Sequence, residues 1–304
     1  MTNALSIDVE ECFQAAEIGA SPAEWDDLPS RVEAQTCRVL EILARHSVRA
    51  TFFILGWVAR RHPQLVREIA GAGHEIGCHS YYHRLIYRLG PEEFAGDTDL
   101  AVEAIADAAG LKPRLYRAPS YSIIFDSLWA LEILAARGFT HDSSIYPIAH
   151  DRYGLPEFGP RARFVSTPAG VLFEIPIATV TVHGTQLPVG GGGYLRLLPY
   201  RYTAAGIRRM NLHDHQPACV YLHPWELDPA QPHVGPGGIS RLRTYAGVRK
   251  MVSKLESLLA DFRFSTLGEV YPFARASESS LPVLGIPDTG TPFSSTKMTP
   301  RDLR

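Results

Sequence analysis

The sequence GCHSYYHR, at residues 77–84, follows an apolar segment that is typical of a buried strand. It contains His79 and His83, whose spacing of four residues can direct two imidazoles to one metal ion. Taken alone this spacing is a weak signal, because histidines are common both in cores and on surfaces. Three other stretches also end an apolar run with residues suited to chemistry, at 6–11 (SIDVEE), 116–122 (YRAPSYS) and 221–226 (YLHPWE). Together the four stretches predict one site built from the ends of several strands.

Strand-like and helix-like segments alternate through the first half of the chain. Apolar and β-branched runs predict strands at 4–9, 50–55, 74–78, 114–117 and 139–143. Amphipathic segments, three of them beginning with proline, predict helices at 29–44, 63–72, 91–109 and 127–137. Such alternation predicts an α/β fold with a parallel sheet or barrel, in which active sites form where the strands end. The polar stretches lie at these ends, which independently supports a site there.

The pattern changes after residue 146, where proline and glycine become frequent. Antiparallel β pieces are expected at 164–167 and 171–182, and then a strand at 218–222, a long helix at 239–262 and a closing strand at 263–267. The four glycines at 190–193 lack the Lys-Ser/Thr of a phosphate loop, so they predict a close approach of the backbone to a ligand or another strand. From about residue 274 the Ser/Pro/Thr/Gly-rich tail is expected to be disordered.

Composition limits the classes of function. The 304 residues suffice for one large α/β domain or two ordinary ones, and the formal net charge of −2 gives no electrostatic reason to expect nucleic acid as a partner. No run approaches the roughly 18 apolar residues of a transmembrane segment. The first residues do not resemble a secretion signal, which predicts a cytoplasmic protein whose four dispersed cysteines are reduced.

Asp8 and Glu10 follow the first predicted strand. They are two residues apart, so both would face the same side of an extended strand. Two histidines and one carboxylate form a common catalytic metal set with open positions for water and substrate. One of these carboxylates can therefore bind the metal while the other acts as a base, although a pair of solvated carboxylates is the simpler alternative.

Three further residues have chemical potential. Arg117, before Ala118 and Pro119, can hold a carboxylate, or form an ordinary surface salt bridge. His223 ends a buried strand, where it is either a general acid or a core residue with satisfied hydrogen bonds. Asp142, at another strand end, is a candidate to orient His223 and to raise its pKa.

In this order the stretches resemble the NodB-homology polysaccharide deacetylases (carbohydrate esterase family 4), over residues 5–267. His79-Ser80-x-x-His83 resembles the metal motif of that family, Arg117-Ala118-Pro119 its Arg-x-Pro motif, and Leu222-His223-Pro224 its closing Leu-x-His region. The wider pattern, with GHEIGCHS, DSSIYP and PVGGGGYLRLLPY, is similar to the deacetylases encoded with exosortase and exopolysaccharide systems, which carry an extra C-terminal region.

The resemblance implies an α/β fold, a distorted (β/α)7 barrel within residues 1–273. A β-rich insertion and a C-terminal helical extension would form a family-specific region at about 150–273. It also implies a divalent metal, zinc in the first place, and the removal of N-acetyl groups from hexosamines of a polysaccharide or its precursor. The expected partner is thus an N-acetylated glycan, with peripheral association to a lipid-linked precursor in the cytoplasm.

The resemblance also implies a role for individual residues. Asp8 matches the base, Arg117 the residue that positions it, and His223 the general acid, with Asp142 as its partner. The implied metal ligands are Glu10, His79 and His83. Ser120, Tyr121 and Trp225 are expected at the substrate, with a backbone N–H near Ser120 facing the oxyanion.

The sequence departs from the family pattern at two places. Val9 follows Asp8 where two adjacent aspartates are usual, so Glu10 would take the ligand role one position later, and Ser120 stands where many members have tyrosine. These departures also resemble a branch that hydrolyses small cyclic amides such as allantoin, partly without metal. A third alternative is a glycan-binding barrel that has lost catalysis, but the intact set of Asp8, His79, His83, Arg117 and His223 argues against it.

Overall fold

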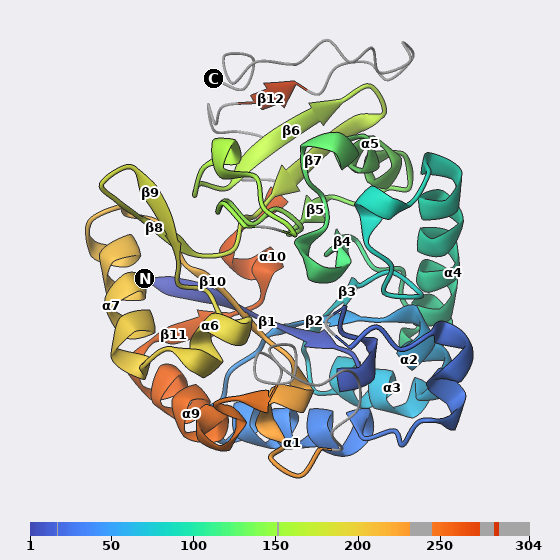
Figure 1. Cartoon of the computed structure of the whole chain (residues 1–304), viewed down its shortest axis with the longest axis horizontal. Coiled ribbons are helices and arrows are strands. Elements are labelled where there is room, and N and C mark those ends of the chain that lie inside the picture. Colours follow the sequence, from blue (N-terminus) through green and yellow to red (C-terminus); the bar gives the residue numbers. More distant parts are fainter. Residues whose placement is uncertain (17, 151, 232–244, 274–282, 286–304) are drawn as a thin grey trace.

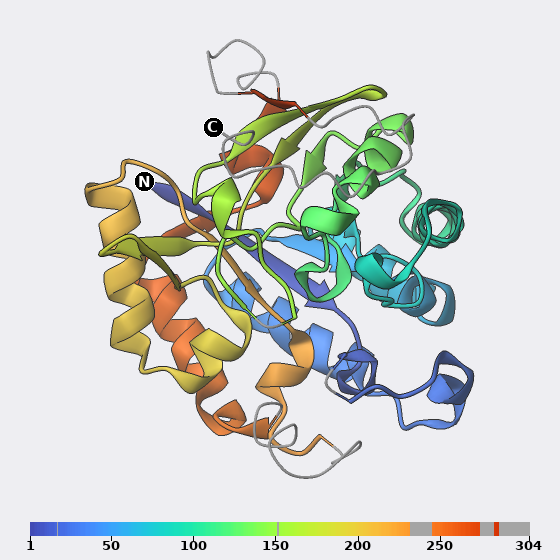
Figure 2. The ribbon, with the colours of Figure 1, turned by 45° about the horizontal axis from the view of Figure 1, so that its top comes forward.

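A curved sheet of mostly parallel strands lies at the centre of the molecule, with helices around its outside (Figures 1 and 2). The computed structural model describes residues 1–304 except 17, 151, 232–244, 274–282 and 286–304. The strands of the main sheet are β1 (Thr2–Val9), β2 (Thr51–Ile54), β3 (Glu75–Cys78), β4 (Leu115–Tyr116), β5 (His141–Asp142), β6 (Arg163–Thr167), β7 (Gly170–Glu174), β10 (Cys219–Leu222), β11 (Arg263–Ser265) and β12 (Val283–Gly285). A separate hairpin consists of β8 (Thr179–Val182) and β9 (Thr185–Pro188).

The strands are ordered β10-β1-β2-β3-β4-β5-β7, and all neighbours in this series run parallel. β6 is antiparallel to β7, and β12 continues the sheet beyond β6. The central strand β1 has seven buried residues out of eight, which explains its apolar sequence. Its register pairs Ile7 with Leu222 and Asp8 with Phe53, so the residues that follow β1, β2 and β10 emerge at the same end of the sheet.

The barrel closes without a continuous ladder between β7 and β10. The segment after β7 crosses this seam: the N–H of Ile175 donates to the carbonyl of Asp142 at 2.8 Å, and the N–H of Ala178 donates to that of Cys219 at 3.0 Å. Seven parallel strands joined through such a seam form the distorted (β/α)7 barrel that the family resemblance implied.

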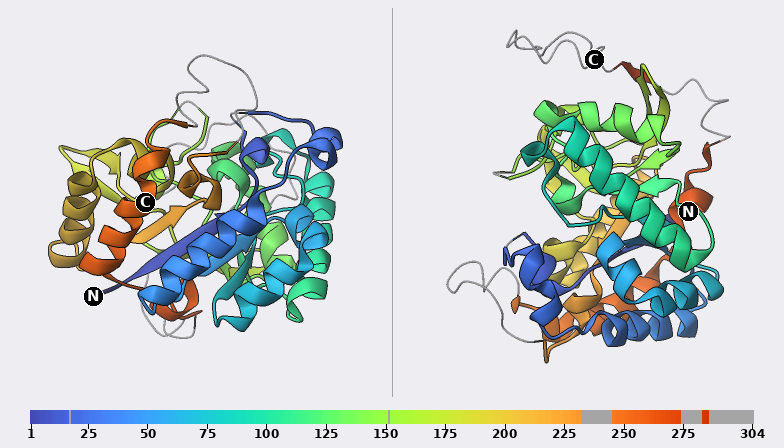
Figure 3. Two further views of the ribbon diagram at one scale, coloured as in Figure 1. Left: turned by 90° about the horizontal axis from the view of Figure 1, so that it is seen from below. Right: turned by 90° about the vertical axis from the view of Figure 1, so that its right-hand side faces the viewer.

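The helices pack on the outside of the strands (Figures 1 and 3). Those of the first half are α1 (Val32–Arg45), α2 (Gly56–Arg61), α3 (Pro63–Gly71), α4 (Pro91–Ala109) and α5 (Trp129–Ala136). Those of the second half are α6 (Gly192–Leu197), α7 (Tyr200–Leu212), α9 (Met251–Asp261) and α10 (Leu267–Val270). No helix among the described residues has the length and apolar character needed to cross a bilayer.

Local sequence sets the bounds of α4, which agree with the prediction. Pro91 occupies the first turn, and the Glu93 carboxylate accepts the N–H of Gly90 at 3.0 Å, which satisfies a backbone donor before the helix. Gly110 ends the helix with φ 72°, the left-handed conformation that favours glycine.

Elsewhere the structure differs from the expectations. Helices α2 and α7 were not predicted. The long helix expected at 239–262 is interrupted at Gly247, whose φ of 84° breaks the helical path, and residues 239–244 lie outside the described residues. The strand at 263–265 pairs with the first residues of β1 instead of closing the barrel. In the tail, Val283–Gly285 forms β12, while the remainder after residue 273 lies outside the described residues.

The glycine run at 190–193 brings two backbones together, as the sequence predicted. The Tyr221 N–H donates to the Gly190 carbonyl at 3.1 Å, and Gly191 forms a parallel bridge with Tyr221. A Cβ at Gly190 would lie 2.6 Å from the Cys219 carbonyl oxygen, and one at Gly191 would overlap the carbonyl of Tyr221. The run is therefore required for this close approach to β10.

We expect Gly191→Ala to lower the free energy of unfolding by more than about 2 kcal/mol, because a Cβ meets backbone at φ 106°. Gly96→Ala, in the middle of α4 with no atom within 4 Å of the new Cβ, should instead stabilise by about 1 kcal/mol. Urea unfolding of both variants checks this pair. Equal effects would mean that the run has no special backbone role.

Candidate active site

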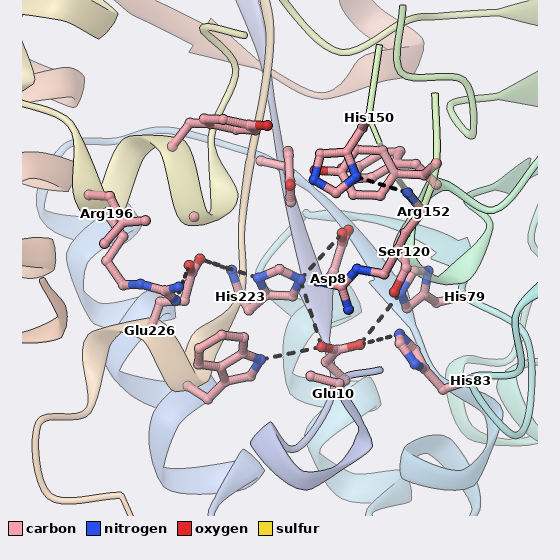
Figure 4. A pocket seen from close by; sticks show the side chains of 18 residues that line it. Asp8, Glu10, His79, His83, Ser120, His150, Arg152, Arg196, His223 and Glu226 are labelled. Atoms are coloured by element: carbon pink, nitrogen blue, oxygen red, sulfur yellow. Dashed lines mark hydrogen bonds and ion pairs between the residues drawn. The ribbon is translucent and has the colours of Figure 1, made fainter. Parts of the chain in front are cut away.

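A cavity of about 350 Å³ opens at the carboxyl ends of β1, β3 and β10 (Figure 4). Asp8 and Glu10 reach it from the end of β1, and His79 and His83 from the loop after β3. His223 follows β10 directly. The structure thus brings together residues that are more than 200 positions apart in the sequence.

Glu10, His79 and His83 form a group with metal-ligand geometry. One ligand atom from each lies within 4.8 Å of the others, and all three residues are buried. Glu10 Oε2 is 2.7 Å from His83 Nε2 and 3.6 Å from His79 Nε2. Glu10, and not Asp8, therefore joins the two histidines.

The donor set fits a divalent cation. His79 Nδ1 donates to the Arg117 carbonyl at 2.8 Å, which turns the lone pair of Nε2 towards Glu10. Glu10 Oε2 is buried, and the atoms that it faces are Nε2 of His83 and Nε2 of His79. Two imidazole nitrogens and a carboxylate oxygen that face one another repel unless a positive charge lies between them.

The charge of Glu10 supports the same conclusion. Burial alone would raise the Glu10 pKa, but His83, His223 and the hydrogen bond with His79 together hold it well below its usual value. Trp225 Nε1 donates to Glu10 Oε1 at 3.3 Å and leaves Oε2 for the histidines. Trp225, expected at the substrate, is only 5% exposed and lines the cavity beside the carboxylate.

The turn that carries the histidines is strained. Among the described non-glycine residues seven have positive φ. Two of them, Ser80 and His83, lie in this turn, and two more, Ser120 and Tyr121, lie in the turn after β4 that also faces the cavity. The Asp97 carboxylate on α4 accepts the N–H of Tyr81 at 2.7 Å and that of Tyr82 at 3.3 Å, and so fixes the first turn. Backbone strain of this kind persists where surrounding contacts over-determine it, commonly at functional sites. Asp97 was not predicted, although its spacing from Phe94 and Ala101, on the apolar face of the expected helix, was a usable signal.

Arg117 holds Asp8. Its guanidinium is fully buried and donates through Nη1 to Asp8 Oδ1 and to Ser6 Oγ, both at 2.7 Å, and through Nε to the Ser143 carbonyl at 3.1 Å. Burial would lower the Arg117 pKa, but Asp8 raises it overall, so the guanidinium stays charged. Asp8 Oδ2 remains on the cavity side, 4.0 Å from His223 Nε2.

His223 is paired with Glu226, so the prediction that Asp142 orients it was wrong. His223 Nδ1 lies 3.2 Å from Glu226 Oε2, and Glu226 Oε1 accepts from Arg196 Nη1 at 2.7 Å. Burial would lower the His223 pKa, but Glu10 and Glu226 raise it to about 9. Sequence reasoning missed Glu226 although its position three residues after His223, as in a capping box, was a usable signal.

Asp142 lies under the site beside another acid, Glu174. The two are register partners on β5 and β7, fully buried, and Asp142 Oδ1 accepts from Ser144 Oγ at 2.5 Å. Burial is the main reason why the pKa of Asp142 is raised and that of Glu174 lies well above its usual value, and Asp142 further raises the pKa of Glu174. Glu174 is therefore the member of the pair that holds a proton more firmly than an ordinary glutamate does.

Ser120, Tyr121 and a group of residues after 143 build most of the rest of the cavity wall. Ser120 and Tyr121, expected at the substrate, line it together with residues of the second half of the chain. Tyr121 packs against Tyr146 and Tyr221 with ring centroids 5.3 and 5.0 Å apart. The second-half residues are His150, Arg152, Tyr153, Gly193, Tyr194, Arg196, Leu197, Tyr221, His223, Trp225 and Glu226 (labelled in part in Figure 4).

Comparisons with known proteins agree with this architecture. Residues 23–138 match the family described as polysaccharide deacetylase, and residues 143–272 match DUF3473, a domain of unknown function. A candidate polysaccharide deacetylase from Mycobacterium smegmatis has a crystal structure that superposes with a TM-score of 0.64 at 20% identity, covering 94% of this chain and 93% of that one. This last similarity shows the fold. The chain thus contains a polysaccharide deacetylase domain of the NodB-homology type, and the DUF3473 domain follows it.

Two curated relatives are similar over part of their length. A peptidoglycan-N-acetylglucosamine deacetylase from Bacillus cereus is 36% identical over 98 residues, which is 32% of this chain and 36% of that protein. A chitooligosaccharide deacetylase from Bradyrhizobium sp. is also 36% identical over 98 residues, which is 32% of this chain and 42% of that protein. The chain thus matches well under half the length of these relatives.

The acid pair predicts a pH-dependent stability. The pKa of Glu174 is raised above 4.5, so above that pH the native protein keeps a proton that the unfolded chain has released, and the stability falls as pH rises through this window. In Glu174→Gln the side chain at this position does not titrate, and its amide group can still donate a hydrogen bond to Asp142. We expect its free energy of unfolding, relative to wild type, to rise as the pH increases above the ordinary glutamate pKa of 4.5.

Urea unfolding across this range measures the effect, and Glu92→Gln, an exposed change of the same type, is the control. A relative stability of Glu174→Gln that does not change with pH would contradict the assignment of the proton to Glu174.

Proposed function

We propose that this protein is a metal-dependent hydrolase that removes N-acetyl groups from hexosamine residues of a polysaccharide or its precursor. The observation that carries the proposal is the single cavity in which Asp8 and His223 adjoin the group of Glu10, His79 and His83. Amide hydrolysis is accelerated when a Lewis acid that polarises the carbonyl oxygen, a general base and a general acid all lie within reach of one amide group. The names of the two relatives, both deacetylases, support the same reaction class.

Zinc suits the ligand group best. One carboxylate and two imidazoles form a common catalytic zinc set that leaves positions for water and substrate. When bound there, the ion would polarise the amide carbonyl and lower the pKa of a water molecule. The remaining tasks fall to side chains of this chain.

Asp8 is suited to take a proton from the attacking water. Arg117 occupies Oδ1 at 2.7 Å, while Oδ2 is directed to the cavity. Because Arg117 is itself held by Ser6 and Ser143, the carboxylate has one orientation, and such preorganisation lowers the cost of reaching the transition state.

His223 is suited to give a proton to the leaving nitrogen. With a pKa of about 9 it is protonated at neutral pH, and Glu226, backed by Arg196, fixes the ring through Nδ1. Nε2 is thereby left facing the cavity, 3.7 Å from Glu10 Oε1. The imidazolium can then release the proton at Nε2 as the C–N bond breaks.

The cavity suits one sugar ring with its acetamido group. Its volume of about 350 Å³ lies at the lower end of ligand pockets, and aromatic side chains such as Tyr121, Tyr221 and Trp225 form much of its wall. The N–H of Tyr121 is already bonded to the Ala118 carbonyl at 3.1 Å, so we assign the oxyanion contact to the backbone N–H of Ser120.

Release of acetate from N-acetylglucosamine oligomers tests the proposal. We expect release that stops after chelation and returns when zinc is added. Hydrolysis of a cyclic amide by metal-free protein would instead favour the allantoinase-like alternative. Glycan binding without any acetate release would favour a binding barrel.

The two carboxylates should respond differently to substitution. Asp8→Asn removes the proton acceptor but no ligand, so we expect zinc occupancy near wild type and a loss of turnover of about 10²–10⁴-fold. Glu10→Ala removes one of three protein ligands, so zinc affinity should fall and excess zinc should restore part of the activity. Calorimetric zinc titrations with both variants decide between these roles. Loss of zinc in Asp8→Asn alone would reverse them.

Glu226→Gln should move the alkaline limb of the pH–rate profile. The pKa of His223 is raised by its acidic partners, so the active, protonated form is lost as pH rises through that value. Without the charge of Glu226 this loss should occur at lower pH, and turnover at neutral pH should fall. Asp228→Asn is the matched control, since Asp228 pairs with Arg31 outside the cavity. An unchanged alkaline limb in Glu226→Gln would exclude Glu226 as the tuning group.

The biological setting belongs to the same proposal. We infer a role in exopolysaccharide biosynthesis on a precursor at the cytoplasmic side of the membrane, on the basis of the sequence pattern shared with exosortase-associated deacetylases. Fractionation of cells that produce the native protein checks the location.

A further inference from the structure

The pair of Asp142 and Glu174 takes no direct part in the reaction proposed above. It lies within the barrel wall, on the neighbouring strands β5 and β7, and does not line the cavity. Asp142 Oδ2 and Glu174 Oε2 are both buried and have no other hydrogen-bond partner. Glu174 Oε1 is fixed by the N–H of Ile145 at 2.9 Å. Two buried acids are retained here at a desolvation cost, which calls for a physical role.

A chain of hydrogen bonds leads from Asp142 towards the metal-ligand group. Ser144 Oγ donates to Asp142 Oδ1 at 2.5 Å, and it accepts the N–H of Ala118 at 2.8 Å. The carbonyl oxygen of the same peptide group, that of Arg117, accepts the Nδ1–H of His79 at 2.8 Å. One peptide unit thus joins the acid pair to His79, and every donor in the series points in the same direction.

Hydrogen bonds arranged in series polarise one another where the surroundings are apolar. A negative charge at Asp142 draws the Ser144 proton, which makes the hydroxyl oxygen a better acceptor for the Ala118 N–H. The peptide is polarised in turn, and the Arg117 carbonyl then binds the Nδ1 proton of His79 more firmly. This holds the ring in one tautomer and makes its Nε2 a more basic ligand.

We propose that Asp142, held in place by Glu174, is a positioning residue for His79, acting through Ser144 and the peptide between Arg117 and Ala118. The inference rests on the proposed metal site, because it assigns His79 as a ligand. Asp142 would then influence zinc affinity without touching the ion. Its negative charge, and not merely its packing in the barrel wall, is the feature that matters.

The zinc affinity of the apoprotein, measured by calorimetry with Zn²⁺, tests whether this series of hydrogen bonds acts on His79. Ser144→Ala breaks the series at its middle, and outer partners of metal ligands typically contribute about 10- to 100-fold in affinity, so we expect a loss of that size. Ser144→Thr keeps a hydroxyl at this position, so its zinc affinity should be close to that of wild type. Asp142→Asn can still accept from Ser144 but has no charge, so it should show an intermediate loss.

The chain offers a matched control for the loss of a buried hydroxyl. Thr51 Oγ1 donates to Glu75 at 2.5 Å and accepts the N–H of Leu267 at 2.8 Å, which is the same bonding pattern at the other end of the barrel. Thr51→Val should lower stability about as much as Ser144→Ala and leave zinc affinity unchanged. Equal zinc affinity in wild type and Ser144→Ala, or an equal loss in Thr51→Val, would overturn the proposal.

A second readout does not depend on metal. ¹⁵N NMR of the histidine rings in the apoprotein should show His79 as the Nδ1–H tautomer in wild type and as a mixture of tautomers in Ser144→Ala. Unchanged His79 signals in Ser144→Ala would overturn the proposal that Asp142 positions His79 through Ser144. If the wild type bound no zinc, the proposed metal site would fail, while the tautomer would still decide whether Asp142 positions His79.

Discussion

The buried guanidinium of Arg117 is the contact on which the site depends. Removing a cation from water is expensive unless it is paired and its donors are satisfied. Arg117 meets this requirement with Asp8, Ser6 and Ser143, and so connects the ends of β1, β4 and β5. Breaking such a buried pair from one side typically costs about 3–5 kcal/mol.

Arg117 also positions both the proposed base and one of the proposed metal ligands. Its side chain fixes the carboxylate of Asp8, and its carbonyl oxygen orients the ring of His79. Base and metal ligand therefore take their positions from one residue at the end of β4. Since Arg117 has no exposed surface, a shift of β4 relative to β1 would disturb both groups together.

The match to two sequence families divides the chain, but the cavity does not follow this division. His79, His83 and Arg117 lie in the part that matches the deacetylase family, whereas Arg196, His223 and Glu226 lie in the part that matches DUF3473. The barrel needs β10 from the second part beside β1 from the first. The DUF3473 region thus completes the barrel and supplies the histidine that we propose as the acid.

Much of the fold could be predicted from local sequence. Helix α4 begins at its proline and ends at its glycine as expected, because these residues act on their own backbone. The long C-terminal helix was wrong in extent, since the left-handed backbone at Gly247 interrupts an otherwise regular apolar pattern. The α2 helix was missed because six residues give too short a pattern to recognise.

For the site, the sequence by itself determined which chemical groups stand at strand ends: Asp8, Glu10, His79, His83, Arg117 and His223. Only the tertiary structure decided which of them meet. Asp8 and Glu10 share one side of the chain, but Arg117 approaches the first and the two histidines the second. The partner of His223 likewise proved to be Glu226, while Asp142 was paired with Glu174. The physical reason is that partner choice among charged groups depends on distances between strands, and these are set by the register and closure of the barrel.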